Sequence, residues 1–243
     1  METLFWTGTS GWTYPDWKGR FYPEDLPSSR WFDHYARIFR SVEVNATFYR
    51  RFKDLTYIRW RDRAPEGFRY VLKIPRYITH LKLLLDVGDE IRKFWQQACL
   101  LEEKFGMLLL QLSPRTPKDP ARLEKALAAF PDPRRVAVEF RNLAWLDDTV
   151  ETLLRDIGAA SCAADSPLGR PCDWLTSHTA YIRLHGRRRW FADKYTGQEL
   201  GHIARLARSF ARRGAKDVYV FFNNDVMAWG PENAVTLQAM LGR

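Results

Sequence analysis

Four charged residues stand inside or at the end of short apolar runs, where a buried β-strand is expected: Glu43, Lys73, Glu139 and Arg183. Burying a charge without a partner costs several kcal/mol, so these residues need an explanation. They could pair with one another as buried ions that plug one end of the fold. Alternatively, the cations could bind an anionic ligand while a carboxylate transfers a proton. Paired buried ions rarely stabilise a protein more than apolar packing does, which favours the functional interpretation.

The side chains of a strand alternate between two faces, so residues two positions apart share a face. Three such pairs occur in the chain: Glu43 with Asn45, Glu139 with Arg141, and Arg183 with His185. If the three pairs face one opening, carboxylates, guanidinium groups, an amide and an imidazole meet there. Such a set can hold an anion and move a proton.

We predict catalytic roles for Glu43, Glu139 and His185, with a carboxylate as general base and His185 as the acid partner. Arg141 and Arg183 would hold the anion. The remaining polar residues at the predicted strand ends would contact the substrate: Asn45, Lys73, Gln111, Asn223, Asn224 and Asp225.

The histidines are few, and no two of them have the spacing of metal ligands: His34, His80, His178, His185 and His202. We therefore predict no metal ligands, although a single divalent cation on Glu43, Glu139 and Asp225 stays an alternative. The glycine-containing stretch from Gly8 to Gly11 lacks the spacing of dinucleotide-binding and P-loop motifs, so no cofactor is predicted.

Eight short apolar runs must position these residues: 4–7, 41–44, 68–72, 107–110, 136–138, 159–163, 180–184 and 218–222. Several are continuously apolar, as expected for parallel strands covered on both faces. Helix patterns separate them: 31–39, 55–63, 89–106, 119–130, 147–158, 199–213 and 231–241. Asp89, Asp119 and Asp147 are the expected N-caps of three of these helices, and Pro231 opens the last one. Pro167, Gly169 and Pro171 make the sixth helix short or missing.

Alternation of strands and helices predicts a parallel sheet, and eight strands in 243 residues fit a closed barrel better than an open sheet. We therefore predict an α/β fold with one domain over residues 1–243, a TIM-like (β/α)8 barrel. In such barrels the active site lies at the C-terminal ends of the strands, where the polar residues above are placed.

The net charge of +9 and the pI of about 9.6 favour an anionic partner, either a small molecule or nucleic acid. The basic, aromatic loop 187–191 follows the seventh strand and could contact phosphates and stack on bases. No obligate protein partner is inferred.

No apolar run approaches a membrane span and the N-terminus lacks a signal-peptide pattern, so we expect no membrane contact and a cytoplasmic location. Cys99 and Cys162 are expected to be buried, reduced thiols.

Seven stretches, in order along nearly the whole chain, resemble the YecE-like family, also called domain of unknown function 72: GTSGWTYPDWKGRFYP, SVEVNATFYR, FRYVLKIPRYITH, LLLQLSP, VAVEFRNLAWL, YIRLHGRR and VYVFFNNDVMAWGPENAVTL. The resemblance implies a TIM-like barrel but no activity, because the activity of the family is not established. Its shared polar positions fall on the following residues: Glu43, Asn45, Thr47, Lys73, Thr79, His80, Gln111, Glu139, Arg141, Arg183, His185, Gly186, Asn223, Asn224, Asp225 and Asn233. On this ground His80 joins the predicted substrate-binding set.

The sequence thus predicts a protein that acts on an anionic, phosphate-containing substrate at the C-terminal mouth of a barrel by general acid/base chemistry. If it is an enzyme, we expect a hydrolase or a lyase with a carboxylate and histidine site. The alternative is a protein that binds or processes nucleic acid with its basic surface. A purely structural protein would leave the charges at the strand ends unexplained.

Overall fold

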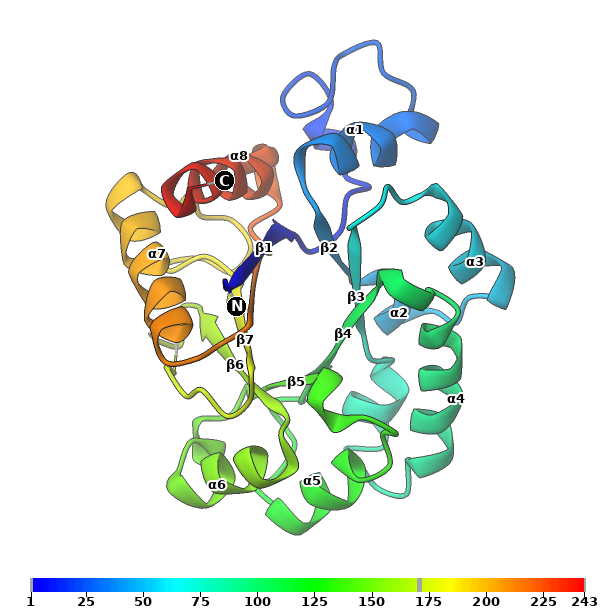
Figure 1. Cartoon of the computed structure of the whole chain (residues 1–243), viewed down its shortest axis with the longest axis vertical. Coiled ribbons are helices and arrows are strands. Elements are labelled where there is room, and N and C mark those ends of the chain that lie inside the picture. The colour runs from blue at the N-terminus through cyan, green and yellow to red at the C-terminus, as the bar shows by residue number, and fades with distance from the viewer. Residues whose placement is uncertain (1, 170–171, 243) are drawn as a thin grey trace.

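The computed structural model describes residues 2–169 and 172–242. Eight parallel strands form one sheet that curls into a nearly closed barrel (Figure 1). The strands are β1 (Leu4–Thr9), β2 (Ser41–Val44), β3 (Arg69–Lys73), β4 (Phe105–Gln111), β5 (Val136–Glu139), β6 (Ala160–Asp165), β7 (Thr179–Leu184) and β8 (Asp217–Phe222). The hydrogen-bonded order runs from β1 through β8 and back down to β2, so β1 and β2 are the two ends of the sheet. The predicted TIM-like α/β fold is confirmed.

Helices surround the sheet on its outer face (Figure 1). They are α1 (Trp31–Ile38), α2 (Ala46–Tyr49), α3 (Asp54–Arg63), α4 (Gly88–Cys99), α5 (Pro120–Leu127), α6 (Asp148–Ile157), α7 (Gly197–Arg212) and α8 (Trp229–Leu241). The connection between β6 and β7 contains no helix in its described residues, 166–169 and 172–178, as predicted. Pro171, part of the signal for that prediction, lies outside the described residues.

Two of the predicted helix starts are confirmed and two are wrong. Asp119 accepts a hydrogen bond from the backbone of Arg122 (3.0 Å), and Asp147 caps α6 in the same way. Asp89 is not a cap, because α4 begins one residue earlier and Asp89 lies in its first turn. There its carboxylate still interacts favourably with the helix dipole. The last helix begins two residues before Pro231, because backbone N–H groups of a first turn need no partner within the helix.

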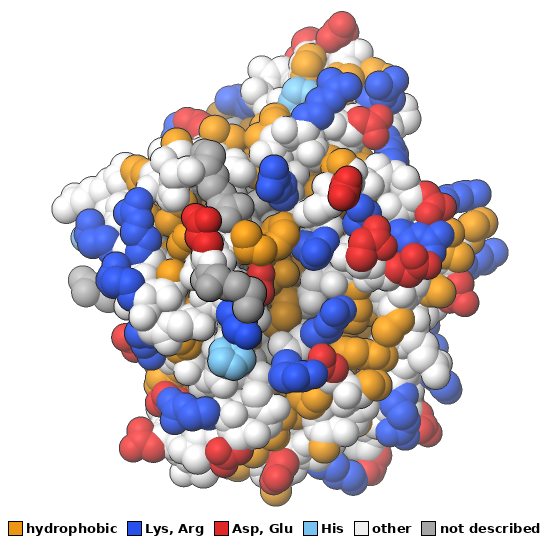
Figure 2. All heavy atoms as spheres, viewed as in Figure 1, with side chains coloured by type: hydrophobic (Ala, Val, Ile, Leu, Met, Phe, Trp, Pro, Cys, Tyr) orange, Lys and Arg blue, Asp and Glu red, His pale blue; other side chains and the backbone are white. Residues whose placement is uncertain are grey.

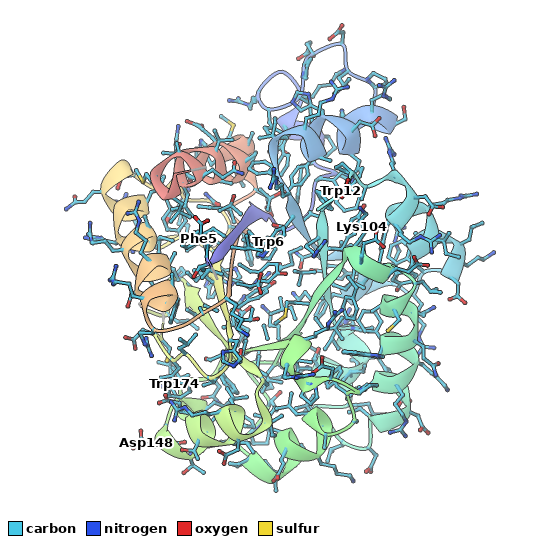
Figure 3. The ribbon with its side chains drawn as sticks, viewed as in Figure 1. Phe5, Trp6, Trp12, Lys104, Asp148 and Trp174 are labelled. Carbon is cyan, nitrogen blue, oxygen red and sulfur yellow. The ribbon has the colours of Figure 1, made fainter. Side chains whose placement is uncertain are left out.

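The apolar side chains form two layers, one on each side of the sheet. Figure 3 shows Phe5 and Trp6 on opposite sides of β1, as expected from the alternation of a strand. Trp6 belongs to a core inside the barrel, whose members come from seven strands: Trp6, Val71, Met107, Leu109, Ala137, Ala160, Cys162, Tyr181, Tyr219 and Phe221. The barrel is therefore filled by side chains and is not an open pore.

The burial of Cys162 is confirmed, whereas the predicted burial of Cys99 is wrong. Helix α4 packs through Ile91, Phe94 and Ala98, and Cys99 follows this face on its exposed side. No helix among the described residues is long and apolar enough to cross a membrane. On the face drawn in Figure 2, Asp and Glu side chains are scattered among the Lys and Arg side chains.

Candidate active site at the barrel mouth

Arg183 lies at the centre of a fully buried ion network near the C-terminal end of the barrel. Its Nε donates to Glu43 Oε2 at 3.0 Å, and its Nη2 donates to Glu43 Oε1 at 2.6 Å. Its Nη1 donates to Glu139 Oε2 at 2.5 Å. All three side chains have no exposed surface. One cation from β7 thus joins carboxylates from β2 and β5.

Both carboxylates of this network accept further hydrogen bonds. Glu43 also accepts from Ser10 Oγ (2.7 Å) and from Tyr181 OH (2.5 Å). Glu139 also accepts from Gln111 Nε2 (3.1 Å). Burial alone would raise both pKa values, but the Arg183 charge holds the pKa of Glu43 below its usual value. Arg141 and Arg183 together hold the pKa of Glu139 well below its usual value. Both groups are therefore ionised at neutral pH.

His185 lies above Glu139 and is held on both ring nitrogens. Its Nε2 lies 3.1 Å from Glu139 Oε1 and 3.0 Å from Arg141 Nη2, and its Nδ1 lies 3.0 Å from Asn223 Nδ2. Burial lowers the pKa of His185 to about 4. The ring is thus neutral at pH 7. The tautomer that donates from Nε2 to Glu139 and accepts at Nδ1 from Asn223 agrees with two of these contacts, and Arg141 Nη2 then lies beside Nε2 without donating to it.

Arg141 carries the network up to the mouth. Its Nε lies 2.5 Å from Glu139 Oε1, and its guanidinium carbon lies 4.7 Å from the centre of the Trp190 ring. The Arg141 side chain keeps 14% of its surface exposed, while the partner Glu139 keeps none. A cation between a buried carboxylate and an aromatic face is fixed in direction, so Arg141 presents a preorganised charge to the mouth.

A cavity of about 490 Å³ opens above this network, and we call it the mouth cavity. Its lining residues come from the ends of β2, β3, β4 and β8 and from the loops that follow strands: Tyr14, Asn45, Phe48, Tyr49, Lys73, Arg76, His80, Gln111, Arg141, Phe191, Asn223 and Asp225. Three of them are Lys or Arg, and one is Asp. The size suits a small molecule, and the charge suits an anion.

Two lining residues titrate near neutral pH. Burial lowers the pKa of Lys73 to about 7 and raises the pKa of Asp225 to about 7. The Oδ1 atom of Asp225 is buried and accepts no hydrogen bond from the described residues. Burial and the charge of Lys73 lower the pKa of His80 to about 4, which leaves a neutral imidazole at the rim.

The predicted site residues lie at two depths in the barrel mouth. The following line the mouth cavity: Asn45, Lys73, His80, Gln111, Arg141, Asn223 and Asp225. The following lie beneath it in the buried network: Glu43, Glu139, Arg183 and His185. Asn224 does not line the cavity, because its Nδ2 donates to Asp193 O (2.8 Å) and to Asn233 Oδ1 (3.1 Å).

Several residues of the site carried no prediction: Ser10, Tyr14, Phe48, Tyr49, Arg76 and Tyr181. The signal for Tyr181 was present, since it stands two residues before Arg183 on the same face of β7. Tyr14 comes from the long connection after β1, where no periodic pattern exists to place a side chain.

The basic loop 187–191 is only partly free. Arg187 forms an ion pair with Asp165 (2.8 Å) and lies 3.8 Å from Glu199. Trp190 lies against Arg141, and Phe191 lines the mouth cavity while keeping 42% of its surface exposed. The loop therefore belongs to the wall of the site.

The alternative of a cation on Glu43, Glu139 and Asp225 finds no support in the arrangement of these groups. Within residues 2–169 and 172–242 no three His, Cys, Asp or Glu side chains are grouped to hold a metal ion. Two of the three carboxylates hold Arg183 instead.

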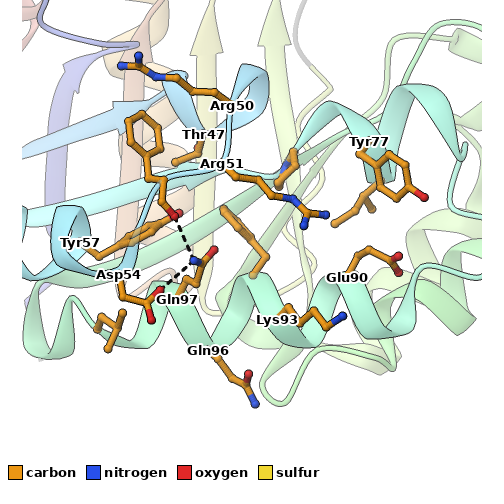
Figure 4. A pocket seen from close by; sticks show the side chains of 15 residues that line it. Thr47, Arg50, Arg51, Asp54, Tyr57, Tyr77, Glu90, Lys93, Gln96 and Gln97 are labelled. Atoms are coloured by element: carbon orange, nitrogen blue, oxygen red, sulfur yellow. Dashed lines mark hydrogen bonds between the residues drawn. The ribbon is translucent and has the colours of Figure 1, made fainter.

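A second cavity of about 490 Å³ lies outside the barrel, between the segment after β2 and α4 (Figure 4). Gln97 on α4 donates to Phe52 O (3.2 Å) and to Asp54 Oδ1 (3.0 Å) across one end of it. Its charged lining is of both signs, with Arg51 and Glu90 on opposite walls. None of the residues of the buried network reaches it.

The sequence and the fold place the chain among known proteins. A family profile described as "Protein of unknown function DUF72" matches residues 6–243. A DUF72 family protein from Thermotoga maritima has a crystal structure that is similar over 99% of this chain and 100% of that chain, with 28% identity and a TM-score of 0.89. A DUF72 family protein from Enterococcus faecalis shares the fold at 21% identity, with a TM-score of 0.83 over 99% and 96% of the two chains. The UPF0759 protein YecE of Escherichia coli (strain K12) is 28% identical over 187 residues, which are 74% of this chain and 65% of that protein. The chain belongs to the DUF72 family.

Proposed function

We infer that the mouth cavity is the active site of an enzyme for a small anionic substrate. The observation that carries this proposal is the lining of the cavity, in which Lys73, Arg76 and Arg141 face a single carboxylate, Asp225. A phosphate or carboxylate group would enter a concave site of positive potential and displace water from it. Arg141 offers the firmest contact, because the protein already holds its guanidinium in place.

Asp225 and Lys73 suit the proton transfers of such a reaction. A general acid or base works best when its pKa lies near the working pH, and both groups have a pKa of about 7. Hydrolysis and elimination both need a group that exchanges a proton at neutral pH. The proposal therefore keeps the expected hydrolase or lyase chemistry.

Glu43, Glu139 and His185, the predicted catalytic residues, take a supporting role in this proposal. Each carboxylate has its oxygens occupied by donors, and neither is exposed to the cavity. His185 has both ring nitrogens engaged. Such groups orient Arg141 and set the electrostatic potential at the mouth, as residues behind a reacting shell do in other enzymes.

Binding of inorganic phosphate, measured by calorimetry, tests the proposal. Arg76→Met and Arg141→Met should each weaken phosphate binding about tenfold or more, because each removes a charge-assisted contact of about 1.5–3 kcal/mol. Arg76→Met is the cleaner variant, because the Arg76 side chain is exposed and lies outside the buried network. Lys125→Met on α5 is the matched control, since it removes an exposed cation far from the mouth. Equal affinities for all three variants and the wild type would overturn the proposal.

A further inference from the structure

Lys73 is a buried amine without a carboxylate partner. It is the last residue of β3, keeps 7% of its surface exposed and lines the mouth cavity. Its Nζ lies 4.1 Å from the centre of the Phe48 ring, and it forms no ion pair within the described ranges. The two carboxylates that act on its charge, Glu43 and Glu139, both hold Arg183. A lysine that serves only as a structural cation would be expected to have such a partner.

The surroundings favour the neutral form of this amine. Burial lowers the pKa of Lys73 to about 7, with a further contribution from Arg183 and Arg141, while Glu139 and Glu43 act in the opposite direction. His80 also faces it, but as a neutral ring. A large fraction of Lys73 is therefore unprotonated at pH 7. An ordinary lysine, with a pKa of about 10.4, is unprotonated in less than about one molecule in a thousand.

Other residues that line the cavity supply an acid, cations for an anionic group, and an aromatic ring beside the amine. Asp225, with its pKa raised to about 7 by burial, still holds a proton in part of the molecules at neutral pH. Arg76 and Arg141 can hold an anionic group of a bound molecule. The Phe48 ring can stabilise a positive charge that forms on the lysine nitrogen.

We propose that Lys73 forms a Schiff base with an aldehyde or ketone that carries a phosphate or carboxylate group. The proposal rests on the proposed function, since it uses the same cavity and the same anion contacts. It names the substrate class, an anionic carbonyl compound, and gives the lysine a covalent role.

The step balances without a further reactant. The Lys73 nitrogen adds to the carbonyl carbon, a C–N bond forms, and one proton moves from nitrogen to the carbonyl oxygen to give a carbinolamine. Asp225 then donates its proton to that hydroxyl group, and the C–O bond breaks. One water molecule leaves with both protons. A protonated imine remains on Lys73, beside the Phe48 ring, and Asp225 is left as a carboxylate.

Reductive trapping tests the proposal on the full chain. The protein is incubated with glyoxylate, a small anionic aldehyde, and sodium cyanoborohydride, and the labelled lysines are identified by peptide mass spectrometry. We expect Lys73 to be labelled at pH 7 about tenfold or more faster than the exposed Lys125. Its labelling rate should rise to half its plateau near pH 7, and inorganic phosphate should slow it. Asp225→Asn should slow labelling of Lys73 but not of Lys125.

The outcomes separate this proposal from the proposed function. Labelling of Lys73 no faster than that of Lys125 in the wild type overturns the Schiff base. If phosphate binding is then still lost in Arg76→Met, the anion site stands without the covalent step. If Lys73 is labelled rapidly but acetaldehyde reacts as fast as glyoxylate and phosphate does not bind, the amine chemistry stands and the anion site falls. The wild-type measurements suffice to decide on the Schiff base, so that decision does not depend on whether a variant folds.

Discussion

The charges of the barrel differ in how far each is removed from water. Arg183 has no exposed surface and two carboxylate partners, whereas Arg141 has one carboxylate partner and a partly exposed side chain. An ion removed from water is tolerated only with partners, and removing one partner leaves the others uncompensated. The position of Arg141 at the mouth therefore depends on the buried network beneath it.

Replacing Arg183 therefore has a large effect on stability. In Arg183→Met, Glu43 would stay buried without a cation and Glu139 would keep only Arg141, so the free energy of unfolding should fall by about 3–5 kcal/mol. Denaturant unfolding followed by circular dichroism measures it. The control is Arg155→Met, which breaks an exposed pair with Glu151 on α6 and should cost at most about 0.5 kcal/mol. A loss in Arg183→Met no larger than in the control would contradict this view of the network.

At the level of elements, the barrel closes between β1 and β2, the two ends of the sheet, through close contact of their backbones. A Cβ atom on Gly8 would lie 2.2 Å from the carbonyl oxygen of Ser41. Tyr35 of α1 bridges the two strands, since its hydroxyl donates to Ser41 O (3.0 Å) and accepts from the backbone N–H of Thr9 (2.9 Å). Ser10 directly follows β1 and Glu43 lies in β2, so the distance between the two strands affects the hydrogen bond from Ser10 to Glu43.

Adding a methyl group at this closure should separate the strands. Gly8→Ala is expected to lower the free energy of unfolding by about 1–3 kcal/mol, the usual cost of overpacking. Gly197→Ala, in the first turn of α7, is the control, because a Cβ there meets nothing within 4 Å. Denaturation midpoints of both variants measure the difference. If Gly8→Ala unfolds at the same midpoint as Gly197→Ala, stability does not depend on the close contact between the backbones of β1 and β2.

For the whole molecule, the charge of +9 leaves nucleic-acid binding as a second candidate function. The specific observation in its favour is the exposed Phe191 next to the exposed Arg188 and Arg189, at the rim of the mouth cavity. Against it, Arg187 of the same loop is paired with Asp165 (2.8 Å), and Arg189 lies 3.9 Å from Asp193, so negative side chains interrupt the basic loop. A continuous phosphate backbone is best held by a continuous positive track.

The salt dependence of binding decides between the two candidates. If the second function is right, single-stranded RNA or DNA should bind at about 50 mM salt and lose most of its affinity by about 200 mM. Arg188→Ala combined with Arg189→Ala should reduce both the affinity and the salt slope. Fluorescence anisotropy with labelled oligonucleotides measures both quantities. An absence of binding at the lower salt concentration removes this candidate and leaves the small anion.

Much of the fold was predictable because its signals are local. Each of the eight strands lies within two residues of its apolar run at the start and end, since continuous apolar segments have few other stable arrangements. The caps at Asp119 and Asp147 followed from local hydrogen bonding. The errors at Asp89 and Cys99 arose where packing against the sheet, rather than a neighbour in sequence, decides where α4 begins and which side it buries.

The sequence by itself determined which side chains enter the barrel, because the alternation of a strand depends on nothing outside the strand. It therefore brought Glu43, Glu139 and Arg183 to one end of one interior. Only the tertiary structure decided their depth and their partners, since these depend on how neighbouring strands are staggered and what covers them. Burial then separated ionised carboxylates below from Lys73 and Asp225 above, whose pKa values shift because water is excluded around them.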